Sequence, residues 1–342
     1  MNKLINKTIS IYQSKKILWQ ILFVVLLALI PLTTDRSYYM GVLCRILLYS
    51  TIAGALNVIN GYTGQTCLGV AGFFCFGCYT EAILATKLGL NFWLCIPLAG
   101  IITGLVGLLV ALPTLKMGGI YLAIVTLGFS EIARLFALNL TPLTGGALGI
   151  KNIPVPTLFG FAFKNSQSYF YIFLAFTILF IVVTHRVINS KLGRAWMSIR
   201  EDQLAAQSLG VNASFYKATN FIYGAFWVGI AGSIYAPYVR FIDSTYFTLD
   251  EGWNILSMVI LGGQGTLVGP IIGSIIVNFL TEVLRPIGQW RLVAFALLII
   301  IMMWKRPQGL AGDSDSKLAG NTNDKKVLKE NLSKLQGKEA SK

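Results

Sequence analysis

The sequence GRAWMSIREDQLAAQSLGVN, residues 193–212, is the longest polar run between the first and the last hydrophobic segments of the chain. Ser198 and Glu201 have the three-residue spacing of a capping box, and Gly210 stands where a helix would end. This pattern predicts one short helix. Such a helix is too short and too polar to cross a membrane.

One side of the predicted helix is weakly apolar. At about 100° per residue, four apolar residues share this side with Asp202, while the other polar residues lie elsewhere. The four are Ile199, Ala205, Ala206 and Leu209. We expect this side to dock against something outside the membrane.

The composition of the whole chain is that of a membrane protein. Of its 342 residues, 55% are hydrophobic and only 12% are charged, against about 25% charged residues in an ordinary soluble domain. The 34 glycines suit close packing of helices in lipid, where small residues let two backbones approach each other. The chain is therefore expected to be all-α and multi-spanning.

Apolar runs long enough for membrane crossing recur along most of the sequence. A helix needs about 20 apolar residues to cross the hydrocarbon core, and the chain has roughly ten apolar segments, of which 253–261 is short enough to be re-entrant or a half helix. They cover residues 17–33, 40–59, a stretch ending near 86, 91–112, 118–139, 169–187, 218–239, 253–261, 266–280 and 292–304. Splitting the segment at the glycines near residue 262 gives an even number of crossings, which two cytoplasmic termini require.

Basic residues orient these segments and divide the chain. Residues 1–16 carry four lysines and no acid, so the N-terminal segment should stay in the cytoplasm. The same rule places the loop 188–217 on the cytoplasmic side of the transmembrane domain 17–311. This loop contains residues 193–212, which we call the opening stretch. Residues 312–342 form a polar tail that we expect to be disordered and cytoplasmic. The 28 basic against 14 acidic residues thus reflect membrane orientation rather than binding to nucleic acid.

Two regions break the apolar pattern with glycine, at residues 61–69 and 262–269. Their similar character hints at an internal repeat, and either could be a broken helix of the kind that lines transport sites. A third irregular region, residues 140–168, is rich in proline and glycine and is predicted to be the longest outer loop.

The sequence contains no recognisable catalytic apparatus. It has no GxxxxGK[ST] nucleotide loop, no paired acids and no nucleophile with a base, so we expect that the chain is not an enzyme. Five cysteines lie in or beside apolar segments and are interpreted as small buried hydrophobes. Cys75 and Cys78 are spaced as Cys-x-x-Cys but lack a second pair, so no metal site is expected.

Polar groups within the apolar segments are the default functional candidates, because burying a charge in lipid is costly. Glu131 and Arg134 are three residues apart on one predicted helix. They either fix a helix end as an ion pair or contact the substrate. A polar cluster at the first glycine break either lines a hydrated passage or simply connects two helices, and the Gly262–Gly265 break has the same two interpretations. The cluster consists of Asn57, Asn60, Thr63 and Gln65.

Five motifs, in the same order and spacing, resemble the LivM-type permeases of branched-chain amino acid ABC transporters. Four lie within the transmembrane region and the fifth is the opening stretch. They are NGYTGQTCLGVAGFFCFGCY (60–79), GGIYLAIVTLGFSEIAR (118–134), TGGALGI (144–150), GRAWMSIREDQLAAQSLGVN (193–212) and VILGGQGTLVGPIIGS (259–274). The chain departs from the pattern at Cys67, where serine is usual, and at Val70, where histidine is common.

The resemblance implies one half of an importer in the bacterial cell membrane. A related second permease, LivH-like, would pair with this chain as a heterodimer. Two cytoplasmic ATP-binding subunits would use ATP and Mg²⁺, while the chain itself binds no cofactor, and an extracytoplasmic binding protein would deliver the ligand.

The resemblance also assigns roles to residues. The opening stretch is similar to the segment by which importer permeases contact their ATPases, although Leu204 stands where the wider motif often has glutamate. The expected coupling residues are Arg194, Arg200, Glu201, Asp202, Ala205, Ala206, Leu209 and Gly210. The candidates for the translocation pathway are Asn57, Asn60, Thr63, Gln65, Tyr121, Thr126, Glu131, Gly145, Gly146, Gly262 and Gly263.

The substrate is less narrowly defined than the family. Urea and short-chain amide importers share much of this pattern, so the cargo is either a branched-chain amino acid or one of those small molecules. The alternative from another class of protein is a stand-alone channel or ion-coupled carrier. Such a protein would need an ion site within the membrane and would transport without a partner.

Overall fold

The computed structural model describes residues 31, 37–115, 117–158, 161–163, 165–284, 290–306 and 308–311. The predicted N-terminal segment 1–16, the tail 312–342 and all of the first predicted span except residue 31 lie outside these residues.

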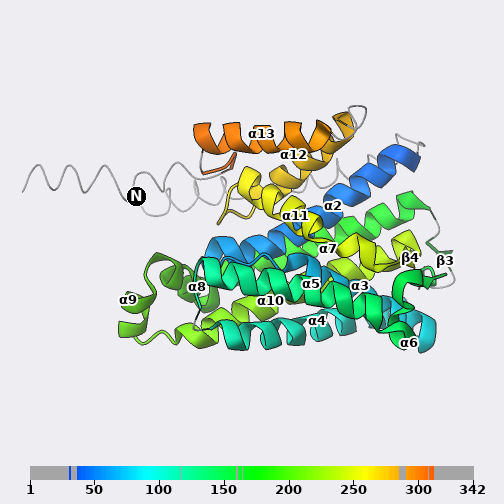
Figure 1. Ribbon diagram of the computed structural model, residues 1–342, viewed down its shortest axis with the longest axis horizontal. Coiled ribbons are helices and arrows are strands. Elements are labelled where there is room, and N and C mark those ends of the chain that lie inside the picture. The colour runs from blue at the N-terminus through cyan, green and yellow to red at the C-terminus, as the bar shows by residue number, and fades with distance from the viewer. Residues whose placement is uncertain are drawn as a thin grey trace, which may run out of the picture.

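Long helices make up most of the described chain, which confirms the all-α, multi-spanning prediction (Figure 1). The helices before the opening stretch are α2 (Ser37–Asn57), which continues into the π-helical turn η1 (Val58–Tyr62), then α3 (Val70–Lys87), α4 (Phe92–Thr114), α5 (Ile120–Asn139) and α7 (Ser166–Ile188). After it comes α10 (Ala213–Val239). Within the described residues, five helices are long and apolar enough to cross a membrane: Tyr38–Tyr62, Phe92–Thr114, Ile120–Asn139, Ser166–Ile188 and Ala213–Val239.

Helix α10 is the centre of the bundle and packs against α2, α3 and α4. Helix α10 approaches its neighbours closely at Gly229. A Cβ atom at this position would lie 2.6 Å from the Thr103 side chain and 2.8 Å from the Ala99 carbonyl oxygen, both on α4. A Cβ atom on Gly77 of α3 would lie 2.7 Å from the Gly229 carbonyl oxygen. Helices α3, α4 and α10 thus meet at a point where α3 and α10 each have a glycine.

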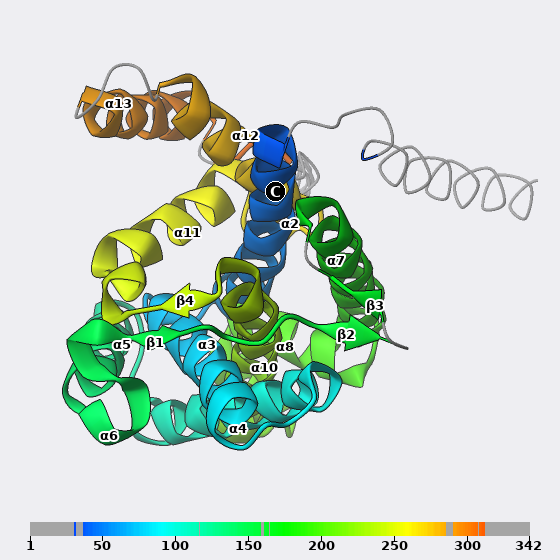
Figure 2. The same cartoon turned by 90° about the vertical axis from the view of Figure 1, so that its right-hand side faces the viewer.

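The second glycine region breaks the chain as predicted. Helix α11 (Leu249–Gly262) ends there and α12 (Gly269–Val283) begins, followed by α13 (Trp290–Lys305). Gly263 and Gly265 have positive φ values of 115° and 77°, which side chains rarely tolerate. In both views α11, α12 and α13 lie along one side of the bundle (Figures 1 and 2), where α11 and α12 pack against α2 and α13 packs against α11 and α12.

Up to residue 165 the predicted loop 140–168 contains only short elements, and α7 begins at Ser166, inside its predicted end. The short elements lie at the end of the bundle opposite α8 (Lys191–Glu201) and α9 (Gln203–Ser208) (Figure 1). β1 (Ile150–Lys151) pairs antiparallel with β4 (Phe241–Ile242), which follows α10, and Figure 2 shows these strands crossing that end of the bundle. The elements here are α6 (Thr141–Thr144), η2 (Gly146–Leu148), β1 (Ile150–Lys151), β2 (Thr157–Leu158), β3 (Phe161–Ala162), β4 (Phe241–Ile242) and η3 (Ser244–Phe247).

Candidate functional site

The opening stretch does not form the single helix that its pattern predicts. It forms α8 (Lys191–Glu201) and α9 (Gln203–Ser208), separated by extended backbone at Asp202. The predicted cap at Ser198 is wrong, because its hydroxyl donates to the Ala195 carbonyl inside α8. The caps are instead Ser190, which accepts from Leu192 N, and Asp202, whose Oδ1 accepts from Leu204 N at 2.8 Å and Ala205 N at 3.0 Å.

The break changes which residues share a face. Ile199 and Ala206 are buried together with Ala213, as the helical pattern indicates. Ala205 and Leu209 do not join them and are exposed. The prediction of one continuous apolar side is therefore wrong. The extended backbone at Asp202 turns α9 relative to α8, so the faces of the two helices no longer line up.

Helix α8 is anchored to the bundle by Trp196. This side chain is 1% exposed and packs with Val58 and Tyr62 of the π-helical turn. Its ring nitrogen donates to the Tyr216 carbonyl of α10 at 3.0 Å. A helix held at this point is connected directly to the end of α2.

The outer surface of α8 and α9 is the part of this region that is free to meet a partner. Leu204 is 75% and Leu209 is 86% exposed. Arg194 is exposed as well and donates to the Asn189 carbonyl just before its own helix. Of the expected coupling residues, all except the buried Ala206 are exposed: Arg194, Arg200, Glu201, Asp202, Ala205, Leu209 and Gly210.

The two glycine-broken regions, which are far apart in sequence, lie against each other. Asn57 is 1% exposed and joins them. Its Oδ1 accepts from Gly265 N at 2.9 Å, and its Nδ2 donates to the Thr266 carbonyl at 2.7 Å. A Cβ atom on Gly61 would collide with Gly265 N. We call this contact, formed by Asn57, Gly61, Gly265 and Thr266, the glycine junction.

The remaining polar residues of the first break are buried and face backbone groups nearby. Asn60 accepts from Cys67 N at 3.0 Å and donates to the Cys67 carbonyl at 3.1 Å. Gln65 donates to the Lys217 carbonyl at 3.5 Å. The Thr63 hydroxyl is buried without a hydrogen-bond partner among the described residues. Their side chains hold the shape of the break, and any role toward a substrate stays a prediction.

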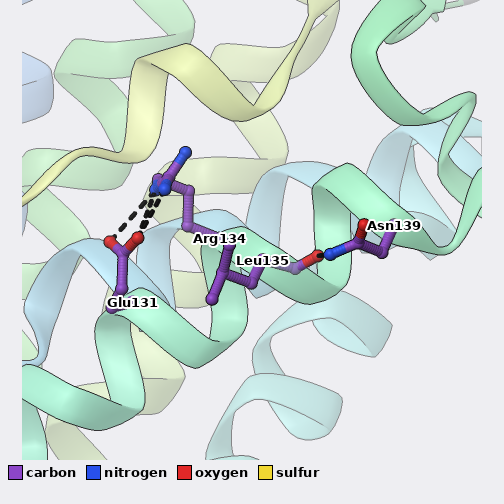
Figure 3. A network of polar contacts seen from close by, with 4 residues as sticks. All are labelled: Glu131, Arg134, Leu135 and Asn139. Carbon is purple, nitrogen blue, oxygen red and sulfur yellow. Dashed lines mark hydrogen bonds and ion pairs between the residues drawn. The ribbon is translucent and has the colours of Figure 1, made fainter.

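The candidates on α5 differ from one another. Thr126 is buried and its hydroxyl accepts from Leu68 N at 2.9 Å, so it supports the start of α3. Tyr121 is 75% exposed. Glu131 and Arg134 form an ion pair, with Arg134 Nε 3.0 Å and 3.1 Å from the two carboxylate oxygens. Figure 3 shows the pair turned toward each other on one side of α5. About a quarter of the Arg134 side chain and a third of the Glu131 side chain are exposed, at 24% and 33%.

The glycine candidates are divided between the two ends of the fold. Gly145 and Gly146 form a turn with positive φ beside the short helix α6, at the end opposite α8. Gly262 and Gly263 close α11 beside the glycine junction. The structure therefore brings Asn57 into contact with the break that Gly262 and Gly263 begin, and it places Gly145 and Gly146 elsewhere.

One contact was not anticipated from the sequence. Glu251 lies in the first turn of α11 and accepts a hydrogen bond from Tyr49 of α2. No local pattern links these residues, since they are 202 positions apart. Within the ranges that the structure describes, no three histidine, cysteine, aspartate or glutamate side chains gather as metal ligands.

Comparison with known proteins places this arrangement in a family. The family described as "Branched-chain amino acid transport system / permease component" matches residues 38–303. The LivM permease protein of the high-affinity branched-chain amino acid transport system of Salmonella typhimurium is 38% identical over 287 residues, 77% of this chain and 68% of that protein. The Escherichia coli LivM protein is 37% identical over the same shares. No solved structure matches the chain.

A second type of relative aligns with the same chain. The LivH permease protein of Escherichia coli is 25% identical over 191 residues, 52% of this chain and 60% of that protein. The matches to both LivM and LivH point to a pair of related permeases in one transport system. Together with the five candidate spans, the match over residues 38–303 shows that this multi-pass membrane protein belongs to the family of permease components of branched-chain amino acid transport systems.

Proposed function

We propose that the chain is the membrane-spanning permease subunit of an ABC importer and forms half of a translocation pathway for branched-chain amino acids. The observation that carries this proposal is the family match over residues 38–303. In the complete transporter a LivH-like permease forms the other half, two cytoplasmic ATPases supply the energy and an extracytoplasmic binding protein delivers the substrate. The chain has no ATPase site of its own and lies in a bacterial cell membrane with both termini in the cytoplasm.

The ATPases are proposed to bind the exposed surface of α8 and α9. Support comes from the two leucines that stand out from this surface, since large exposed apolar side chains outside the lipid favour a protein contact. Asp202 holds α9 at a fixed angle to α8 by its two capping bonds. The partner would therefore meet a rigid corner rather than a flexible loop.

Changing the two exposed leucines to aspartate is expected to separate the permease from its ATPases. Leu204 and Leu209 are 75% and 86% exposed, so Leu204→Asp with Leu209→Asp should leave the fold intact. Burying two carboxylates at an interface costs several kcal/mol, so we expect co-purification to fall at least about tenfold. The measurement is the amount of ATPase retained on affinity-purified permease.

A matched control lies at the opposite end of the bundle. Leu88, the residue after α3, is 64% exposed, and Leu88→Asp should retain the ATPases. Equal retention by the control and the double variant would contradict the proposed contact surface.

The side of α5 that carries Glu131 and Arg134 is proposed to face the hydrated passage between the two permeases. Only 33% of the most apolar window of this helix is buried inside the chain, and a partly exposed ion pair toward lipid would be costly. The residues of the glycine breaks, including Asn57, Asn60, Thr63, Gln65, Gly262 and Gly263, are proposed to shape the wall at one end of this passage. Tyr121 and Thr126 lie on the same helix as the pair, and Gly145 and Gly146 lie near the outer mouth.

Removing the negative charge of the pair should show whether it faces water or lipid. If the pair faces water, Glu131→Gln should lower the free energy of unfolding by no more than about 1 kcal/mol. Uptake should nevertheless fall about tenfold, because the arginine then presents an unbalanced charge to the passage. Thermal unfolding and uptake by the reconstituted complex are the two measurements. A large loss of stability with normal uptake per folded molecule would place the pair against lipid instead.

The substrate and the need for partners are tested together. The complete complex, reconstituted with its binding protein and ATP, should accumulate labelled leucine and not labelled urea. The permease without ATPases should accumulate neither. Urea uptake would reassign the substrate, and leucine uptake by the isolated chain would indicate a carrier or channel.

A further inference from the structure

The side chain of Arg200, at the last turn of α8, reaches the glycine junction. Its Nη1 donates to the Gly61 carbonyl at 2.6 Å. Its Cγ lies 3.3 Å from the position that a Cβ atom on Gly64 would occupy, and a Cβ atom on Gly265 would collide with Nη1. One guanidinium therefore contacts both glycine-broken regions.

The backbone at this point needs such a contact. Gly61 is next to last in η1, so its carbonyl belongs to a helix end, where backbone acceptors lack helical partners. π-helical turns themselves are rare and are concentrated at functional positions. The charged donor satisfies this acceptor, and charge-assisted hydrogen bonds are stronger than neutral ones.

The junction is also closed from within the bundle. Asn57 binds Gly265 N and the Thr266 carbonyl, as described above. α2 and the α11–α12 connection are thus joined by Asn57 on one side, and Arg200 joins α8 to both. Trp196 fixes the same face of α8 against Val58 and Tyr62.

We propose that Arg200 is a positioning residue that makes α8, the end of α2 and the α11–α12 connection move as one body. Direct contact of Arg200 with the ATPase stays a prediction, whereas its contact with the glycine junction is present in the structure. Any force on α8 then reaches two membrane segments at once rather than bending the loop between α7 and α10. The connection to ATP hydrolysis rests on the proposed function, whereas the mechanical connection is a property of this chain alone.

The mechanical part is tested by distances between spin labels in the purified permease pair without ATPases. Labels are introduced by Met197→Cys on α8 and Val268→Cys at the start of α12, which are 37% and 56% exposed. The five native cysteines are all buried and free, so labelling is selective. We expect one narrow distance distribution, which Arg200→Gln broadens or splits. An unchanged distribution in that variant overturns the proposal.

A second variant perturbs the contact from the other side. Gly265→Ala places a methyl group where Nη1 lies and should broaden the same distribution. Because Gly265 has a positive φ of 77°, backbone strain needs its own control. Gly89 has φ of 62° and open space around it, so Gly89→Ala carries the strain without the collision and should leave the distribution narrow.

The coupling part is tested in the complete reconstituted transporter. Arg200→Gln should keep its ATPases and hydrolyse ATP, but leucine uptake per ATP should fall about tenfold, within the usual range of coupling between sites. Arg200→Lys should recover part of this loss, because an ammonium group can still donate to Gly61. Arg186→Gln, an exposed arginine in the last turn of α7, should keep the wild-type ratio.

These results separate the two proposals. If the wild-type complex neither hydrolyses ATP nor transports leucine, the proposed function fails while the label distances still decide the role of Arg200. A wild-type uptake per ATP in Arg200→Gln overturns the coupling role even where the complex works.

Discussion

Replacing Gly229 by leucine is expected to prevent the bundle from assembling, with the yield of folded protein falling to background. The first added carbon would lie 2.6 Å from the Thr103 side chain and 2.8 Å from the Ala99 carbonyl oxygen of α4. Backbone cannot move aside as a flexible side chain can, so α4 would have to leave α10. In lipid no hydrophobic force restores such a contact, because helix association depends on close packing itself.

The measurement is the monodisperse fraction in detergent after expression, together with the melting temperature of what is recovered. Gly128→Leu is the control, because Gly128 lies in the middle of α5 with open space around it. It adds the same side chain to a spanning helix without a collision. Wild-type recovery of the Gly229 variant would mean that α4 and α10 do not meet at this residue.

Five of the predicted segments, 40–59, 91–112, 118–139, 169–187 and 218–239, correspond to described helices that are long and apolar enough to cross a membrane. In lipid every backbone polar group must be satisfied within a helix, so a long apolar run has almost one possible structure. The predicted segment 91–112 corresponds to α4 (Phe92–Thr114), and 118–139 to α5 (Ile120–Asn139). The glycine break before α12 was visible as well, because turn-forming residues interrupted the run.

The opening stretch was harder because it lies outside the lipid, where several local structures compete. Both Ser198 and Asp202 have side chains that can cap a helix. Burial of Trp196 against the end of α2 decides between them, since it holds α8 in a register that leaves Asp202 beyond the helix end. That burial depends on a tertiary contact, which the local pattern does not contain.

The candidate site shows the same division between local and long-range information. Asn57 and the glycines were selected as unusual polar or flexible residues among apolar ones. Their pairing across 208 positions could not be seen without the fold. Arg200 was selected through a family resemblance that points outward to an ATPase, whereas its side chain turns inward to Gly61.

Replacing Asn57 by alanine is expected to be the most damaging polar change in the chain. The variant leaves Gly265 N and the Thr266 carbonyl without their partner in a site where Asn57 is 1% exposed. An unsatisfied buried group costs about 1–3 kcal/mol, and two are created at once. We expect a melting temperature lower by several degrees, together with loss of uptake. Thermal unfolding in detergent measures the first effect and reconstituted uptake the second.

Two further variants, Asn57→Asp and Asn139→Ala, are the controls for the loss of stability in Asn57→Ala. Aspartate keeps the acceptor for Gly265 N but turns an oxygen toward the Thr266 carbonyl, so it should recover little of the stability. The Asn139 side chain is exposed and donates to the Leu135 carbonyl of its own helix (Figure 3), so its removal should change the free energy of unfolding by less than about 0.5 kcal/mol. A double variant tests whether Asn57 and Arg200 hold one rigid junction. If they do, Asn57→Ala with Arg200→Gln should lose less stability than the sum of the two single losses, because Asn57→Ala alone already loosens the junction that Arg200 contacts. Additive losses would mean that the two side chains stabilise separate elements, and α8 would then move independently of the membrane segments that it contacts.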